Sequence, residues 1–502
     1  MKTHCSGYDP TSLQALASAR PEARREMISQ LTRRHFLGGT AKAIGSAALA
    51  GLLQQDGYAA PKLLPNGGLH FAPKAKRVIS LFMAGAPSQL ETWDYKPDLV
   101  KYFDKDLPES IRDGQVLTGM TASQARLPVA PSRFSFSQQG KSGRWVSELF
   151  PNIGKVVDEL AVIYSMQTDA INHEPAILFM STGVMIPGRP CLGSWLSYGL
   201  GRMNEDLPAF VVLTSKLPVN ANIQALSSRL WSSGYLSPEH AGVALRAGGD
   251  PVLYLSDPAG MTRDVRRAMI DGVNEVNHLT SAEFSDPETE ARISQYEMAF
   301  RMQASVPELT DLSKESQRTW DLYGPKAKEP GTYAYNCLMA RRMAERNVRC
   351  IQVYERGWDA HNDLPNRMKV LCEDVDRPTY ALITELKERG LLDETLVMWG
   401  GEFGRTVYSQ GGLTAEKYGR DHHPRCFSMW MAGGGIKGGA SYGATDEFSY
   451  NIIQDPTPVR DLNATILHLL GVDHERLTFR FQGLEARLTG VIPAKVIKPL
   501  LA

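Results

Sequence analysis

Short continuous apolar runs alternate along the chain with longer segments in which apolar residues return at helical spacing. Each run ends in glycine, a polar residue or a charge, as expected where a buried strand meets a loop. Strands that alternate with helices in this way are typical of a mostly parallel sheet covered by helices on both faces. We therefore predict an α/β fold with strands at residues 77–85, 160–166, 210–214, 349–357, 395–403 and 427–434.

Two segments carry clear helical signals. Residues 374–390 lie between the fourth and fifth predicted strands, and their apolar residues fall on one helical face ahead of Gly390, which is placed to end the helix. This predicts a strand, crossover helix and strand unit. Residues 461–471 predict another helix, with Asp461 as its cap, a buried stripe of leucine and isoleucine, and Gly471 at its end.

The chain from residue 60 to residue 502 shows no internal repeat and no Pro- or Ser-rich break. It exceeds the usual size of a domain, but without a linker a single large domain is a better prediction than two. A more charged helical stretch at residues 285–330 is expected as an elaboration docked on the sheet.

Residues 1–59 have a different character. Arg33 and Arg34 precede a weakly apolar stretch, rich in glycine and alanine, that reaches Leu53, and a small-x-small cleavage site follows after Ala59. This arrangement resembles a twin-arginine export signal, which carries proteins that are already folded. The alternative is a surface amphipathic helix that begins with two arginines. We expect an exported protein, periplasmic or otherwise extracytoplasmic, that can be loaded with metal before export.

Charge and cysteine content narrow the classes of partner. Lys+Arg and Asp+Glu both number 55, and no long Lys/Arg run offers a binding surface for nucleic acid or for an anionic membrane. After residue 59 no segment approaches the roughly 18 apolar residues of a membrane-spanning helix. The six cysteines form no C-x-x-C pair, so buried free thiols are expected, with one disulfide as the alternative. The class of partner that we expect is a small or polymeric anionic substrate.

Carboxylates and imidazoles gather where the late predicted strands end. Asp359 and His361 follow the strand at 349–357, Glu402 follows the next one, and His422 and His423 lead into the last. Ligands of open α/β sheets bind beyond the carboxyl ends of the strands. Mixed nitrogen and oxygen ligands suit a divalent ion, with Zn²⁺ or Mn²⁺ favoured and Fe also compatible. The alternative is a salt-bridged polar cluster, in which Glu402 pairs with Arg405.

A second candidate group follows the strand at 160–166. Pro175 fits the first turn of a helix, which places Asn172 and His173 at a helix N-terminus that favours an anion. Arg405 could steady the same anion, and His173 could serve as nucleophile, general acid or orienting group. Equally, Asn172 could cap the helix while His173 faces solvent. Polar residues after the first strand could line the same rim, namely Ser88, Gln89, Glu91 and Asp94.

The ordered motifs GAPSQLETWDYKP, NHEPA, YEMAFRMQASVPEL, GWDAHND, LLDETLVMWGGEFGRT and GRDHHP resemble the exported bacterial family of domain of unknown function 1501. That family is similar to the sulfatase and alkaline phosphatase superfamily. The resemblance spans nearly all of the chain after the export signal. It implies a three-layer α/β/α sandwich, alkaline-phosphatase-like, with a metal site formed by Asp and His after late strands.

By position, Asp359 and His361 match the metal-binding Asp and His of the superfamily, Glu402 stands where an Asp is usual, and His422 or His423 matches the final histidine. The chain departs from the pattern in two places. Its first strand ends without the Asp that commonly bridges metals, and His173 stands where a hydroxyl or modified-cysteine nucleophile is expected. No C-x-P-S-R stretch occurs, so formylglycine sulfatase chemistry is not expected.

Two functions fit these observations. The first is an exported, sulfatase/phosphatase-like metal-dependent hydrolase that acts on a phosphate or sulfate ester or a related anionic bond. The second is a non-catalytic, metal-containing binding protein of the same fold, which the missing first-strand Asp and nucleophile favour.

Overall fold

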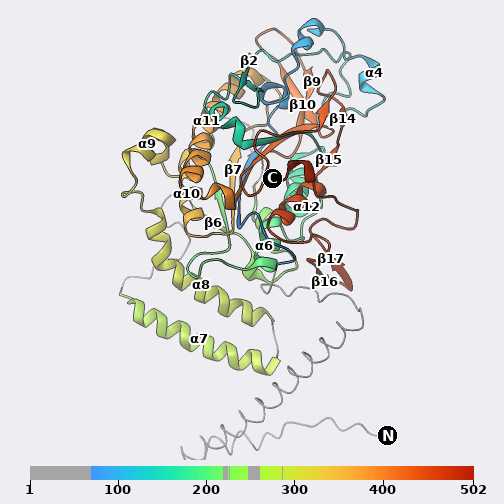
Figure 1. Cartoon of the computed structure of the whole chain (residues 1–502). Helices are drawn as coiled ribbons and strands as arrows, with labels where there is room; N and C mark the ends of the chain where they lie inside the picture. Colours follow the sequence, from blue (N-terminus) through green and yellow to red (C-terminus); the bar gives the residue numbers. More distant parts are fainter. Residues whose placement is uncertain (1–68, 219–223, 225, 247–259, 285–286) are drawn as a thin grey trace, which may run out of the picture. The chain divides into compact units, whose positions relative to one another are not determined.

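The computed structural model describes residues 69–218, 224, 226–246, 260–284 and 287–502, which all belong to one compact unit, Leu63–Ala502 (Figure 1). The predicted export signal at residues 1–59 lies outside the described residues. Among the described helices, none combines the length and the apolar character that crossing a bilayer requires.

A nine-stranded mixed sheet is the centre of this unit. Its spatial order is β12 (Ser441–Tyr442), β4 (Leu160–Gln167), β11 (Phe427–Ala432), β8 (Thr395–Gly400), β1 (Arg77–Ala84), β7 (Cys350–Arg356), β5 (Phe210–Thr214) and β6 (Val243–Leu245), and β15 (Thr457–Pro458) also pairs with β4. The six predicted strands are confirmed as β1, β4, β5, β7, β8 and β11. β11 runs antiparallel to both of its neighbours, and the other strand pairs of this sheet are parallel.

Helices cover both faces of the sheet, because both faces of its central strands are apolar. In β1, Ile79 and Leu81 pack in one core cluster with α10 (Tyr333–Glu345) and α11 (Leu364–Glu388). Val78 and Phe82 point to the other face, as alternate residues of a strand must, and pack in a second cluster. That cluster contains α5 (His173–Thr182), α6 (Leu192–Leu200) and α12 (Val459–Leu469). The predicted three-layer α/β/α arrangement is confirmed.

The ends of two predicted helices need correction. The crossover helix α11 begins at Leu364, ten residues before the predicted start at residue 374, because Pro365 fits its first turn. Asp461 does not cap α12: Pro458 occupies the cap position, and the Asp461 carboxylate accepts a hydrogen bond from the Lys495 backbone.

Shorter elements surround the sheet. The predicted elaboration at 285–330 contains α8 (Pro287–Thr310) and α9 (Gln317–Tyr323), and α7 (Arg263–Phe284), which was not predicted, packs against α8. β9 (Gly404–Gln410) and β10 (Gly419–His423) form an antiparallel hairpin, which lies between β8 and β11 in the sequence. The remaining short α-helices and strands of the described residues are α3 (Gln89–Thr92), α4 (Glu109–Arg112), β2 (Phe136–Gln139), β3 (Arg144–Ser147), β13 (Ala444–Thr445), β14 (Ile452–Gln454), β16 (Phe479–Phe481) and β17 (Leu484–Ala486).

Candidate metal centre

Three chain segments bring histidines and an aspartate to the carboxyl edge of the sheet. Asp359 and His361 follow β7, and His173 is the first residue of α5, which follows β4. His422 lies in β10, directly ahead of β11. In a parallel strand, preceding residues would lie at the opposite edge. Because β11 runs antiparallel to its neighbours, the residues before it reach the same edge as those that follow β7.

The side chains of these four residues converge on one oxygen atom. Asp359 Oδ1 lies 2.8 Å from His361 Nε2, 3.1 Å from His173 Nε2 and 3.5 Å from His422 Nε2. Each residue offers one such atom, and all four atoms lie within 4.8 Å of one another. The structure therefore brings Asp359, His361 and His422 together, and His173 is the fourth member of the group.

The second ring nitrogen of each histidine is held by an acceptor. His173 Nδ1 donates to Glu402 Oε1 (2.6 Å), His361 Nδ1 to Gln410 Oε1 (2.5 Å) and His422 Nδ1 to the Ile171 carbonyl (2.7 Å). A neutral imidazole that donates from Nδ1 presents a lone pair at Nε2, and metal-binding histidines are commonly oriented in this way.

The buried polar atoms at the centre lack partners that would satisfy them. Within the described residues, His173 Nε2, His422 Nε2 and Glu402 Oε2 are buried without a hydrogen-bond partner. Imidazole lone pairs and a carboxylate oxygen repel one another unless a cation lies between them. Three nitrogen donors and one oxygen donor therefore fit a divalent ion such as Zn²⁺.

The protonation of these side chains follows from the same geometry. Burial raises the pKa of Asp359, but the three neighbouring imidazoles and the charge of Arg405 outweigh it and hold that pKa below its ordinary value. Burial lowers the pKa of His173, but Asp359 and Glu402 raise it above the ordinary value. Burial, with Arg405 and His173, lowers the pKa of His422 to about 4. The centre therefore keeps an ionised carboxylate and a neutral His422 at neutral pH.

A family model described as "Protein of unknown function (DUF1501)" matches residues 75–501. The chain belongs to the DUF1501 family. The match includes every residue of the metal centre and confirms the resemblance that the motifs indicate. No curated protein sequence matches this DUF1501 chain.

Solved structures with a similar arrangement differ widely from this DUF1501 chain in sequence. A phosphonate monoester hydrolase from Silicibacter pomeroyi is 11% identical, with a TM-score of 0.33 over 84% of this chain and 76% of that one. An alkaline phosphatase superfamily protein from Vibrio parahaemolyticus is 10% identical, with a TM-score of 0.35 over 84% and 73%. A sulfatase from Pseudoalteromonas sp. is 14% identical, with a TM-score of 0.30 over 91% and 73%. Likenesses at these scores do not identify the reaction of the DUF1501 chain, which has to be argued from its own residues.

Arg405 of the DUF1501 chain does not lie where an anion-binding group was expected. Its side chain is fully buried behind Asp359, with Nη2 2.7 Å from Asp359 Oδ1. The same guanidinium donates to the backbone carbonyls of Gly85, Ala86 and Arg420. Arg405 therefore positions Asp359 and the surrounding loops, and the ion pair with Glu402 considered from the sequence does not form.

Glu402 and His423 also lie outside the group of four. Glu402 accepts hydrogen bonds from the Gly85 backbone (2.9 Å) and from His173, so it contacts the centre through His173. His423 is buried, and its Nε2 donates to the Tyr450 carbonyl at 2.7 Å. Adjacent residues of a strand point to opposite faces, so His422 and His423 in β10 cannot both enter one site.

Gly85 and Gln410 support the centre, although the sequence did not mark them. Gly85 has φ +112°, and a Cβ there would lie 2.5 Å from the Asp359 backbone nitrogen. A glycine as the last residue of a predicted strand was the available signal for this close approach. Gln410 ends β9 and orients His361; no pattern in the sequence could have identified it.

The residues predicted to line a rim after β1 are instead buried supports. Gln89 bonds the Arg405 backbone, Glu91 pairs with Arg420, and Asp94 accepts from Thr445, while Ser88 is also buried. Access to the centre is provided elsewhere: the His173 and His361 side chains are 16% and 15% exposed, and Asn172 before α5 is exposed. Asn172 holds the cap position of α5 without a side-chain cap hydrogen bond.

Proposed function

We propose that this DUF1501 protein is an exported metal-dependent hydrolase that cleaves a phosphate or sulfate ester or a related anionic bond. The observation that carries the proposal is the set of three Nε2 atoms around Asp359 Oδ1, each imidazole fixed through its Nδ1. A surface cluster without a ligand does not need three imidazoles oriented through such bonds. We propose Zn²⁺ or Mn²⁺ as the ion, because both accept mixed imidazole and carboxylate ligands.

The residues around the centre suit an anionic substrate. A divalent ion held there would supply Lewis acidity, polarising an ester oxygen and acidifying water. α5 begins at the centre, and the first N–H groups of a helix have no partner within the helix. The positive end of its dipole favours a bound oxyanion beside His173. Asp359, held ionised by Arg405, supplies the negative charge that keeps a cation in place.

One observation favours the second function, a metal-containing binding protein. Four protein donors complete a tetrahedron, whereas catalytic zinc sites commonly keep one position open for water or substrate. Hydrolysis therefore requires a fifth position at the ion or the release of one ligand. Asp359 is held by Arg405, whereas His173 and His361 are the partly exposed members. Water or substrate would therefore approach the ion from the side of those two histidines.

Export remains part of the proposal because of residues 1–59. The pair Arg33–Arg34, the weakly apolar stretch and the small-residue site after Ala59 support twin-arginine targeting to the periplasm or another extracytoplasmic compartment. A protein that crosses a membrane folded can carry an ion acquired in the cytoplasm, which suits a buried metal centre.

The test combines metal content with turnover. The purified full chain is analysed for bound metal and then assayed on phosphomonoester, phosphodiester, phosphonate ester and sulfate ester substrates. The hydrolase proposal requires a bound divalent ion and turnover of at least one ester that chelation abolishes and the same ion restores. Bound metal without turnover of any ester favours the binding protein. Absence of metal after growth with added Zn²⁺ and Mn²⁺ contradicts both.

A further inference from the structure

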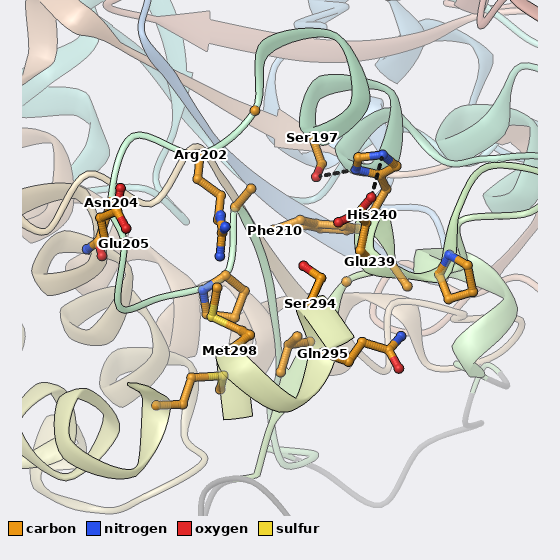
Figure 2. Close-up of a pocket in the computed structure, with 18 of the residues that line it drawn as sticks. Ser197, Arg202, Asn204, Glu205, Phe210, Glu239, His240, Ser294, Gln295 and Met298 are labelled. Atoms are coloured by element: carbon orange, nitrogen blue, oxygen red, sulfur yellow. Dashed lines mark hydrogen bonds and ion pairs between the residues drawn. The ribbon is translucent and has the colours of Figure 1, made fainter. Parts of the chain in front are cut away.

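A second feature lies at the opposite edge of the sheet. A pocket of about 820 Å³ opens where β5 and β6 begin, and its walls come from the end of α6, the loop after α6, η4 (Pro238–His240) and α8 (Figure 2). No residue of the metal centre lines it. Its volume falls within the range of about 300–1,000 Å³ that is common for small-molecule sites.

The floor of the pocket is apolar. Phe210, the first residue of β5, lines it together with Met298 and Met302 of α8. A Cβ at Gly193 or at Gly242 would lie 2.6 Å from carbons of the Phe210 ring, so this ring is held by close contact with two glycines. Methionine side chains adapt to the shape of an apolar ligand. The floor therefore combines a fixed aromatic edge with adjustable thioethers.

One wall carries a cation without a counter-charge. Arg202, in the loop after α6, extends into the pocket toward Met298 (Figure 2). Among the described residues it forms no ion pair or hydrogen bond, whereas the nearby Glu205 is paired with Arg301 at 3.1 Å. An arginine directed over an apolar floor suits a ligand carboxylate, which it can bind through two parallel hydrogen bonds.

The opposite wall carries an acid without a cation. Ser197 Oγ lies 3.0 Å from His240 Nδ1, and Glu239 Oε1 lies 3.8 Å from His240 Nε2. Burial lowers the pKa of His240, although the charge of Glu239 acts in the other direction, so the imidazole is neutral at neutral pH. Apart from this imidazole at 3.8 Å, no cationic side chain pairs with the Glu239 carboxylate among the described residues. Because 3.8 Å exceeds hydrogen-bond distance, the three side chains lack the orienting bond of a hydrolytic triad.

We propose that this pocket binds a short apolar zwitterion, of which a dipeptide or tripeptide of apolar residues is the simplest example. The ligand carboxylate pairs with Arg202, its ammonium group pairs with Glu239, and its apolar side chains lie on Phe210 and Met298. Two polar side chains at the rim can bind the peptide groups in between: Ser294 and Gln295. This inference does not depend on the metal centre, so chelation leaves the binding unchanged.

The test uses three ligands that share the same two side chains and differ at their termini. Leu-Leu has both charges, N-acetyl-Leu-Leu only the carboxylate, and Leu-Leu amide only the ammonium group. Titration calorimetry on the full chain, with and without chelator, is expected to give one site for Leu-Leu with a dissociation constant on the order of 0.1–1 mM. Each blocked derivative is expected to bind about threefold to tenfold more weakly, because the charged groups of the wall are partly exposed.

Variants assign each charge to its wall. Arg202→Gln should weaken the binding of Leu-Leu and N-acetyl-Leu-Leu but leave that of Leu-Leu amide unchanged. Glu239→Gln should weaken the binding of Leu-Leu and Leu-Leu amide but leave that of N-acetyl-Leu-Leu unchanged. Glu205→Gln is the matched control, because its carboxylate is already paired with Arg301. Met298→Trp should abolish binding by filling the floor, with circular dichroism as the check on its fold. Equal affinities for the three ligands, affinities indifferent to both charge variants, or no binding of Leu-Leu at millimolar concentration would overturn the proposal.

Discussion

At the scale of single residues, two adjacent histidines have different surroundings. His422 Nε2 faces Asp359, whereas His423 Nε2 is bonded to the Tyr450 carbonyl. The two acids differ in the same way. Asp359 contacts the three imidazoles directly, whereas Glu402 contacts only one of them, His173. Residue type alone therefore does not decide a role here. The direction in which the backbone presents each side chain does.

A graded series of variants tests this arrangement. His361→Ala removes one donor and is expected to lower metal affinity by more than about 100-fold, and Glu402→Ala, which frees His173 Nδ1, by about 10–100-fold. His423→Gln is the matched control and should leave affinity unchanged. Metal per chain, measured after dialysis against a competing chelator, gives the ranking. Full occupancy in His361→Ala, or a loss in His423→Gln equal to that in His361→Ala, would contradict the assignment.

Glu355 in β7 gives a prediction about pH. It is fully buried, and neither carboxyl oxygen has a hydrogen-bond partner within the described residues. Burial, and after it the charge of Asp374, raises its pKa well above the ordinary value of 4.5. The folded state therefore keeps a proton that the unfolded chain releases, so this contribution to stability is complete below pH 4.5 and declines as pH rises toward the folded-state pKa.

Glu355→Gln has no proton to lose at this position. Its free energy of unfolding relative to the parent should rise with pH across the interval above pH 4.5, by at most about 1.4 kcal/mol per pH unit. Denaturant unfolding of both proteins at several pH values measures the difference. Glu416→Gln, at an exposed glutamate, is the control and should run parallel to the parent. A constant difference between Glu355→Gln and the parent would show that Glu355 is ionised in the folded protein.

At the scale of elements, the β9–β10 hairpin builds much of the centre's support. It carries Arg405 and His422, and it is anchored to α3 by a buried ion pair between Arg420 and Glu91, with 2.6 Å between Nη2 and Oε1. Tyr418 donates to the same Glu91 oxygen at 3.0 Å. Both partners of the ion pair are fully buried. Removal of either charge leaves the other without compensation in a site that water does not reach.

Glu91→Gln is therefore expected to lower the free energy of unfolding by about 3–5 kcal/mol and to weaken metal binding by loosening the hairpin. Asp98→Asn is the control, because its ion pair with Lys101 is exposed and screened by water, so its loss should change the stability little. Denaturant unfolding measures both variants. A cost for Glu91→Gln no greater than that for Asp98→Asn would mean that the pair does not hold the hairpin.

The elements also show how far the sequence could lead. The six strands were predictable because each is a buried apolar run, and the meeting of Asp359 and His361 at the sheet edge was predictable because they follow β7. The choice between His422 and His423 was not, because it depends on the phase of β10, a strand whose sequence, GRDHH, carries no apolar alternation. The role of Arg405 depends on carbonyls far apart in the sequence, which no local pattern reveals.

At the scale of the described molecule, the two edges of one sheet carry different chemistry. Imidazoles and an ionised carboxylate meet beyond the carboxyl ends of the strands, while an apolar floor between an arginine and a glutamate lies where β5 and β6 begin. The residues of the first edge can hold an ion between their lone pairs, and those of the second edge present separated charges to an organic ligand. The two sites can therefore be tested independently, by chelation in one case and by charge-matched ligands in the other.

Targeting concerns the full chain, and we predict that Arg33→Lys with Arg34→Lys retains the protein in the cytoplasm. The twin-arginine interpretation depends on both arginines, because lysine keeps the charge but not the planar guanidinium. Cell fractionation with immunodetection measures the distribution, and Lys42→Gln in the apolar stretch is the control that should still be exported. The retained protein should contain as much metal as the exported one, because an ion bound in a buried centre is acquired during folding, before translocation. Normal export of the double variant would refute the targeting prediction. A metal-free retained protein would instead mean that the ion enters outside the cytoplasm.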